Sequence, residues 1–215
     1  MNNNLIRRFA VMCVGLIIMG LGIALFKISL MGNDPSTAMV MAIGDRIGIE
    51  FSVVLIVANA IWFVAEIIFG RRYIGIGTFA NWFGVGTIAA FWIDAISGML
   101  TVPQDLVPRI LIMFVGVLIL SLAASMYQTS NLGIAPYDVL SIILADKFPV
   151  PYFWCRILTD SVCAIAAFLF GGLIGLGTLF CALGLGPFIT FFDRHVSEKL
   201  CKTRAGDCKL QENNV

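Results

Sequence analysis

The sequence has little charge. Only 13% of its 215 residues are Asp, Glu, Lys or Arg, whereas 60% are hydrophobic. One soluble domain of this length cannot bury so much apolar surface, so an ordinary globular fold is excluded and lipid is indicated as the solvent. The formal net charge of +1 provides neither a basic stripe for nucleic acid nor an acidic tail. We therefore expect an integral membrane protein whose partner is the lipid bilayer, with no nucleic acid bound.

Histidine and catalytic motifs are also scarce. His195 is the only histidine, and the six cysteines show no Cys-x-x-Cys spacing. A zinc site needs several such ligands close together, so we expect no metal site and packed, reduced thiols. The sequence contains no nucleotide-binding loop, His-Glu-x-x-His or Gly-x-Ser-x-Gly motif. We accordingly predict no catalytic residues, no cofactor and no enzymatic activity.

Long apolar runs dominate what is present. A helix that crosses the hydrocarbon core needs about 20 apolar residues, within a range of roughly 17 to 25. Six stretches qualify: residues 9–26, 51–69, 73–93, 110–130, 152–170 and 173–192. Two shorter apolar pieces, 36–47 and 137–148, each follow a proline that suits the first turn of a helix. Neither piece is long enough to cross, so we expect re-entrant or interfacial half-helices.

The chain repeats itself. A shift of 101 residues superimposes Gly32 on Gly133 and Pro35 on Pro136, and after one deletion a shift of 100 superimposes residues 74–78 on 174–178. Each copy contains three predicted spans and one half-helix. Because three is an odd number, the second copy must enter the membrane from the opposite side. The predicted fold is therefore an all-α membrane protein of six spans, built as two inverted three-helix repeats.

The basic residues assign an orientation to this topology. With the N-terminus inside, Arg7-Arg8, Arg71-Arg72 and the basic tail are all cytoplasmic, as the positive-inside rule requires. The predicted organisation is a cytoplasmic N-terminus (1–8), the first repeat (9–98), an extracytoplasmic linker (99–108), the second repeat (109–193) and a partly disordered cytoplasmic tail (194–215). Both termini are thus expected on the cytoplasmic side.

Polar residues within the spans are the first candidates for function. Transporters built from inverted repeats place their sites near the midplane between the copies, and ionisable groups within the membrane are costly. Asp160 and Asn59 are repeat equivalents and could coordinate one ligand or ion from opposite sides. Alternatively, Arg156 lies one turn before Asp160 and could pair with it merely to lower the cost of insertion. The sequence leaves both interpretations open.

The loops before the half-helices supply further candidates. Backbone N–H groups at a helix N-terminus can meet an anionic group, which makes Asn33 and Asp34 in the first copy candidate ligand-binding residues. Asp34 could instead simply cap its own helix. In the second copy, Gly133 and Ala135 precede the half-helix.

Because the side chain of Ala135 cannot cap a helix, this N-terminus is freer to bind a ligand. The residues that follow it, Tyr137 and Asp138, therefore join the candidates. Elsewhere, we expect Glu66 to form an ion pair with Arg71-Arg72 near the cytoplasmic face. The alternative for Glu66 is a proton carrier.

Several motifs together resemble a known family. The Gly-x-x-Pro loop after the first span of each copy, the Ile-Gly-x-Gly-Thr opening of each third span and the pair Arg71-Arg72 are similar to the bacterial YczE/YyaS/YitT membrane proteins. The resemblance covers nearly all of residues 5–195. It implies a multi-pass protein of the bacterial inner membrane, of a kind often called permeases, without an assigned substrate. It offers no catalytic residue.

Two functions follow from these features. The first is a small-molecule transporter or permease with its site between the inverted repeats, driven by an ion gradient or by a separate energising subunit. The second is a non-transporting membrane module, either a substrate-capture subunit of an energising complex or a scaffold for membrane enzymes. An unidentified small molecule or ion, further copies of the chain and an energising subunit are the partners left open.

Overall fold

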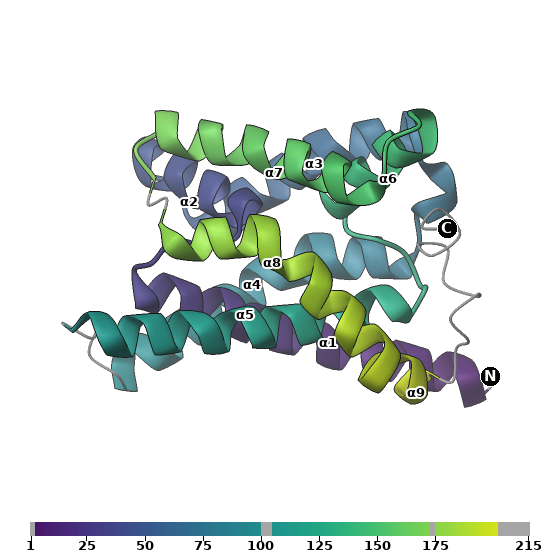
Figure 1. Cartoon of the computed structure of the whole chain (residues 1–215), viewed down its shortest axis with the longest axis horizontal. Coiled ribbons are helices and arrows are strands. Elements are labelled where there is room, and N and C mark those ends of the chain that lie inside the picture. Colours follow the sequence, from purple (N-terminus) through teal and green to yellow (C-terminus); the bar gives the residue numbers. More distant parts are fainter. Residues whose placement is uncertain (1–2, 100–104, 173–174, 202–215) are drawn as a thin grey trace.

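A computed structural model of the chain describes residues 3–99, 105–172 and 175–201. These residues form helices joined by short loops, without a strand among them, which confirms the all-α class. The elements are α1 (Asn3–Ser29), α2 (Pro35–Ile47), α3 (Phe51–Phe69), the 3-10 turn η1 (Arg71–Tyr73), α4 (Ile76–Met99), α5 (Leu106–Thr129), α6 (Asp138–Lys147), α7 (Tyr152–Leu169), α8 (Leu176–Phe192), the π-helical turn η2 (Asp193–Ser197) and α9 (Glu198–Cys201). Figure 1 shows the long helices lying roughly side by side.

Within the described part of the chain, five helical segments are long and apolar enough to cross a membrane. They are Asn4–Ser29, Phe51–Phe69, Ile76–Gly98, Leu106–Thr129 and Leu176–Cys201. Each overlaps one of the predicted spans. The remaining predicted span coincides with α7, an 18-residue helix that carries Arg156 and Asp160. A sixth span at α7 therefore stays a prediction.

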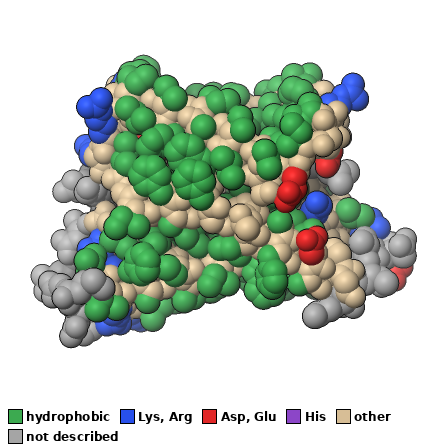
Figure 2. Space-filling model, turned by 180° about the vertical axis from the view of Figure 1, so that it is seen from behind, with side chains coloured by type: hydrophobic (Ala, Val, Ile, Leu, Met, Phe, Trp, Pro, Cys, Tyr) green, Lys and Arg blue, Asp and Glu red, His purple; other side chains and the backbone are tan. Residues whose placement is uncertain are grey.

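The outer surface of the helices is apolar. Figure 2 shows hydrophobic side chains over most of the visible face, with charged side chains gathered toward its left and right ends. Large apolar side chains such as Ile61, Phe91 and Ile165 are more than 60% exposed. Soluble monomers rarely expose apolar patches of this extent. The distribution is that of a helical bundle with lipid around its middle.

Helices α2 and α6 are too short to cross. At a rise of 1.5 Å per residue, the 13 residues of α2 and the 10 of α6 span about 20 and 15 Å, against about 30 Å of hydrocarbon. Pro35 occupies the first turn of α2, and the Asp34 carboxylate accepts a hydrogen bond from the backbone N–H of Thr37 at 3.0 Å. Helix α2 ends at Gly48, which has a φ of 72°. In Figure 1, α2 and α6 lie at opposite ends of the molecule.

Helix packing follows the internal repeat. Helices α1 and α5, which are repeat equivalents, pack against each other along the bundle. Helix α4 packs on α1, and correspondingly α8 packs on α5. Helix α2 contacts both α3 and α7, and α6 contacts the same two helices. Helices of the first half of the chain are thus interleaved with helices of the second half.

The loops before the half-helices are held by reciprocal backbone contacts. The N–H of Gly77, at the start of α4, donates to the carbonyl oxygen of Leu132 at 2.8 Å. The N–H of Gly177, at the start of α8, donates to the carbonyl oxygen of Met31, also at 2.8 Å. Leu132 and Met31 are repeat equivalents, as are the two glycines. Each copy therefore anchors the loop of the other copy.

The predicted segment boundaries can be placed only in part. The expected linker at 99–108 is shorter in the structure, because Met99 still belongs to α4 and Leu106 already begins α5. Residues 100–104 lie outside the described residues. Of the expected tail at 194–215, the part up to Cys201 continues α8 as helix. The rest of that tail also lies outside the described residues.

The close approach of Leu132 requires glycine at position 75. A Cβ atom at Gly75 would lie 2.0 Å from the Leu132 carbonyl oxygen, so this backbone contact could not persist. We expect Gly75→Ala to lower the free energy of unfolding by about 1–3 kcal/mol, as overpacking typically does. Thermal or denaturant unfolding of the purified protein in detergent measures this loss.

Gly186→Ala is the matched control. A Cβ at Gly186 meets no described atom within 4 Å, and alanine favours a helix interior more than glycine does. Its stability should stay equal or rise slightly. Equal losses in the two variants would contradict the proposed role of the Gly75 contact.

Candidate functional site

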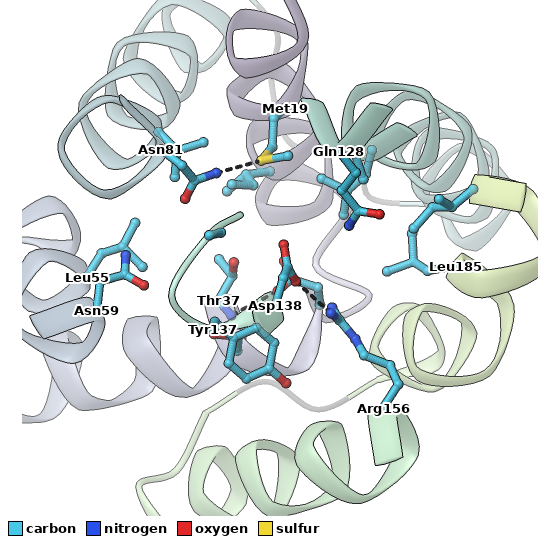
Figure 3. Close-up of a pocket in the computed structure, with 18 residues that line it drawn as sticks. Met19, Thr37, Leu55, Asn59, Asn81, Gln128, Tyr137, Asp138, Arg156 and Leu185 are labelled. Atoms are coloured by element: carbon cyan, nitrogen blue, oxygen red, sulfur yellow. Dashed lines mark hydrogen bonds and ion pairs between the residues drawn. The ribbon is translucent and has the colours of Figure 1, made fainter. Parts of the chain in front are cut away.

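A polar pocket lies in the interior of the bundle. Its volume is about 100 Å³, and it is bordered by α1, α3, α4, α5, α7, α8 and the beginnings of both half-helices. Apolar side chains such as Met19 and Leu185 form much of its wall. The polar lining residues are Asp34, Ser36, Thr37, Asn59, Asn81, Gln128, Tyr137, Asp138 and Arg156. Figure 3 shows Asp138 near the middle of this group, with Arg156 reaching toward it.

Many lining residues are related by the internal repeat. The pairs that both line the pocket are Met19 and Leu120, Ile23 and Ala124, Asp34 and Ala135, Ser36 and Tyr137, Thr37 and Asp138, Leu55 and Arg156, and Val85 and Leu185. The pocket is therefore lined by residues from both halves of the chain. Its charge is less evenly divided, because Arg156 and Asp138 of the second copy occupy the positions of Leu55 and Thr37 in the first.

Arg156 joins two carboxylates. Its Nη1 donates to Oδ1 of Asp138 at 2.6 Å, and its Nε lies 3.3 Å from the Asp160 carboxylate one turn along α7. The guanidinium also lies over the Tyr137 ring, 5.2 Å from its centroid. The predicted pair of Arg156 and Asp160 is present in the structure. The second carboxylate, that of Asp138, comes from α6 and extends the pair into a network between two helices.

Asp160 is a supporting residue of the pocket. It is 1% exposed and accepts a hydrogen bond from the Tyr137 hydroxyl at 2.5 Å. This contact is made by the residue that follows the loop of residues 133–136. Among the described residues, no hydrogen bond joins Asp160 to Asn59. Asp160 thus orients Tyr137 and Arg156, and these two side chains line the pocket.

Three amides border the pocket. Asn59 is 4% exposed, and its side chain forms no hydrogen bond within the described part of the chain. Asn81 contacts the sulfur of Met19 at 3.6 Å, and Gln128 lies on α5 across the pocket from Asn59. Asn59 was a candidate from sequence, whereas Asn81 and Gln128 were not. Their polar side chains in otherwise apolar spans were the available signal.

The two loops contribute differently. Asp34 lines the pocket while it caps α2, so both interpretations of this residue hold geometrically. Asn33 does not line the pocket, because its Oδ1 accepts from the backbone N–H of Asp34 and its Nδ2 donates to the Ile23 carbonyl. In the other copy Ala135 lines the pocket, whereas Gly133 packs against Gly75 with a φ of 127°.

The site has an excess of acidic groups. Asp34, Asp138 and Asp160 stand against the single guanidinium of Arg156. Burial raises the pKa of Asp34 above its ordinary value, although the hydrogen bond from Thr37 opposes this shift. Burial also raises the pKa of Tyr137, so its hydroxyl stays protonated and donates to Asp160. The site is therefore suited to a ligand that carries positive charge or several hydrogen-bond donors.

The predicted ion pair of Glu66 with Arg71-Arg72 is wrong. Glu66 is fully buried, and neither carboxylate oxygen has a hydrogen-bond partner within the described residues. Arg71 donates to the carbonyl oxygen of Ile67, and Arg72 pairs with Asp146. The physical reason is helical geometry: residues five or six positions apart are not neighbours on one helix face, and α3 ends at Phe69.

Removing Arg156 should test the network. Arg156→Leu leaves the Asp138 and Asp160 carboxylates without their cation, so we expect a loss of about 3–5 kcal/mol in unfolding free energy. Adding Asp160→Leu should recover part of this loss by removing one of the two carboxylates. Lys27→Leu, which deletes an exposed cation on α1, should leave stability unchanged. Equal melting temperatures for Arg156→Leu and Lys27→Leu would show that the network contributes nothing.

Comparison with known proteins places the chain in a family. The model of a family of unknown function, DUF6198, matches residues 6–194. An uncharacterised protein of Haemophilus influenzae is 27% identical over 188 residues, covering 86% of this chain and 83% of the relative. The uncharacterised protein YyaS of Bacillus subtilis is 26% identical over 204 residues, covering 90% and 96%.

The uncharacterised membrane protein YczE of Bacillus subtilis is 24% identical over 192 residues, covering 89% of this chain and 87% of the relative. These relatives confirm the resemblance inferred from the sequence motifs. No solved structure matches the chain. The chain is a membrane protein that belongs to the DUF6198 family.

Proposed function

We propose that the protein is a small-molecule transporter of the bacterial inner membrane and that the pocket between its two repeats is the substrate site. The observation that carries the proposal is the set of repeat-related residues around one polar pocket, with amide groups left available for a ligand. Substrate sites of inverted-repeat transporters lie at such positions. The proposed activity is binding and translocation, without a chemical step.

The proposed topology has six spans in two inverted repeats. The two ends of the described chain lie together, because Nη2 of Arg7 in α1 donates to the Lys199 carbonyl oxygen in α9 at 3.0 Å. An even number of spans brings both ends to one side, so α7 has to cross in addition to the five apolar helices. Leu158, Val162 and Ile165 form an exposed apolar face on α7, while Asp160 points inward. The positions of α2 and α6 at opposite ends support inversion.

The orientation follows from charge. Arg71-Arg72 and the two ends of the described chain carry basic residues, which favour the cytoplasmic side. The N- and C-termini are therefore proposed to be cytoplasmic. In this orientation the α2 half-helix lies toward the outside and the α6 half-helix toward the cytoplasm.

The half-helices suggest how access could alternate. Each begins at the pocket, with Thr37 at the start of α2 and Asp138 at the start of α6. Each begins after a loop that is anchored to a helix of the other repeat. A rocking motion of one repeat against the other would move one half-helix away from the pocket while the other closes it. No nucleotide-binding loop occurs in the sequence, so an ion gradient or a separate subunit would supply the energy.

The pocket limits the ligand. Its volume of about 100 Å³ is well below the roughly 300–1,000 Å³ of sites for drug-sized molecules. A ligand of a few heavy atoms fits this state of the protein. The excess of carboxylates favours small cations or donor-rich neutral molecules over anions.

Ligand-dependent stabilisation tests the proposal. A ligand that binds only the folded state at 100 times its Kd raises stability by about 2.7 kcal/mol. We expect a panel of small amines, guanidines and polar metabolites to include a compound that raises the melting temperature of the purified protein. Asn59→Leu should weaken that compound's binding at least about tenfold, because it removes an amide that borders the pocket.

Thr87→Val is the control, since Thr87 is exposed on the outer side of α4. Its affinity for the compound should match that of the unchanged protein. Binding that survives Asn59→Leu unchanged would contradict this pocket as the site. If the protein binds no compound but co-purifies with one partner protein, the alternative function is favoured. That alternative is a non-transporting module, either a substrate-capture subunit or a scaffold.

A further inference from the structure

A second buried acid lies outside the pocket wall. Glu66 is fully buried on α3, and both of its carboxylate oxygens lack a hydrogen-bond partner among the described residues. It lies seven residues, or about two helical turns, after Asn59, so the two side chains are on the same face of α3. The inner face of α3 thus presents an amide to the pocket and an unpartnered carboxyl beyond it.

A second polar group, the hydroxyl of Tyr127, is also buried in the bundle. Tyr127 of α5 is fully buried, and its hydroxyl also lacks a partner within the described part of the chain. Both Glu66 and Asp138 are near enough to act electrostatically on this hydroxyl. Asp138 lines the pocket and pairs with Arg156. Tyr127 therefore lies within the electrostatic reach of both Glu66 and the charged side of the pocket.

The cations around α3 interact with other groups. Arg71 donates to the Ile67 carbonyl, Arg72 pairs with Asp146, and the Lys147 ammonium lies over the Phe69 ring at 3.4 Å. Tyr73, in the turn after α3, donates to Asp146. On the other helices packed against α3, the charged groups are Asp45 and Arg46 of α2 and Asp94 of α4, all exposed at the surface.

A carboxylate in this environment is costly. Burying an ionised group without a cation or a donor costs several kcal/mol, and binding a proton removes the charge. Among the described residues no cation or donor contacts the Glu66 carboxylate, so binding a proton removes its charge. Uptake converts the carboxylate to a carboxylic acid, and release returns the proton to water.

We propose that Glu66, buried without a partner on the face of α3 that carries Asn59, is a proton-binding site whose occupancy is coupled electrostatically to the charge of Asp138 in the pocket. This inference rests on the proposed transport function and assigns its driving ion. Negative charge on Asp138 favours a proton on Glu66, whereas a cation bound beside Asp138 favours release of that proton. A proton on Glu66 and a cation beside Asp138 thus weaken each other's binding, and a proton/cation exchanger requires this coupling.

Infrared difference spectroscopy of the purified protein tests proton binding without a known ligand. We expect a protonated carboxyl C=O band that is present at low pH and disappears as the pH rises. Glu66→Gln, which keeps the shape but cannot titrate, should lack this band, whereas Glu50→Gln, at an exposed position before α3, should retain it. If the glutamine variant does not fold, Glu66→Asp replaces it in the test. This variant keeps a carboxyl group, and its C=O band should be shifted. A band that is identical in Glu66→Gln would overturn the assignment.

The Asp138→Asn variant tests the linkage to the pocket. Removing the negative charge near Tyr127 should move the disappearance of the Glu66 band to lower pH by roughly half to one unit. An unmoved titration would overturn the linkage and leave Glu66 an isolated buried acid. Ligand-induced stabilisation of Glu66→Gln separates the proposed substrate pocket from the proposed proton site. If this variant still binds the ligand, the transport proposal is supported even where Glu66 does not titrate.

Discussion

The structure depends on the reciprocal backbone contacts by which each repeat holds the loop of the other. Lipid offers no hydrogen bonds, so irregular backbone at membrane depth must find its partners within the protein. The carbonyl oxygens of Met31 and Leu132 find them at the N–H groups of Gly177 and Gly77. Glycine at Gly75 and Gly175 makes this approach possible, because a Cβ at either position would lie within about 2.2 Å of the same carbonyl oxygens. The loops thus held are the ones that begin the half-helices and bring Thr37 and Asp138 to the pocket.

The two halves of the chain contribute different side chains to the pocket. The two copies provide equivalent positions around one space, but Leu55, Thr37 and Asn59 of the first copy correspond to Arg156, Asp138 and Asp160 of the second. The first half of the chain thus contributes apolar side chains, the Asn59 amide and the Asp34 carboxyl, and the second contributes a network of charges held by Tyr137. A ligand between them would meet hydrogen-bonding groups on one side and charge on the other. Relative motion of the copies would change both sets of contacts together.

The sequence predicted the helices well because their signals are local. Apolar length identified the long helices, and proline and length identified α2 and α6, whereas the repeat inferred from the shift of 101 residues stays a prediction. The pair of Arg156 and Asp160 was predictable because it lies within one helix. Contacts between helices were not predictable, because they depend on how the helices rotate against each other. Examples are the hydrogen bond from Tyr137 to Asp160 and the ion pair of Arg156 with Asp138. The prediction for Glu66 was wrong for the same reason. Its face of α3 turns inward, away from Arg71-Arg72.

The inverted arrangement of the two repeats is the central claim, and the sidedness of two positions tests it most directly. Arg71 lies in the turn after α3 and Phe170 directly after α7, and these turns are repeat equivalents. Single cysteines at Arg71→Cys and Phe170→Cys, in a background without other cysteines, can be labelled with a membrane-impermeant maleimide in spheroplasts and in inverted vesicles. The account predicts that Phe170→Cys reacts in spheroplasts and Arg71→Cys only in inverted vesicles. Labelling of both positions from the same side would contradict it.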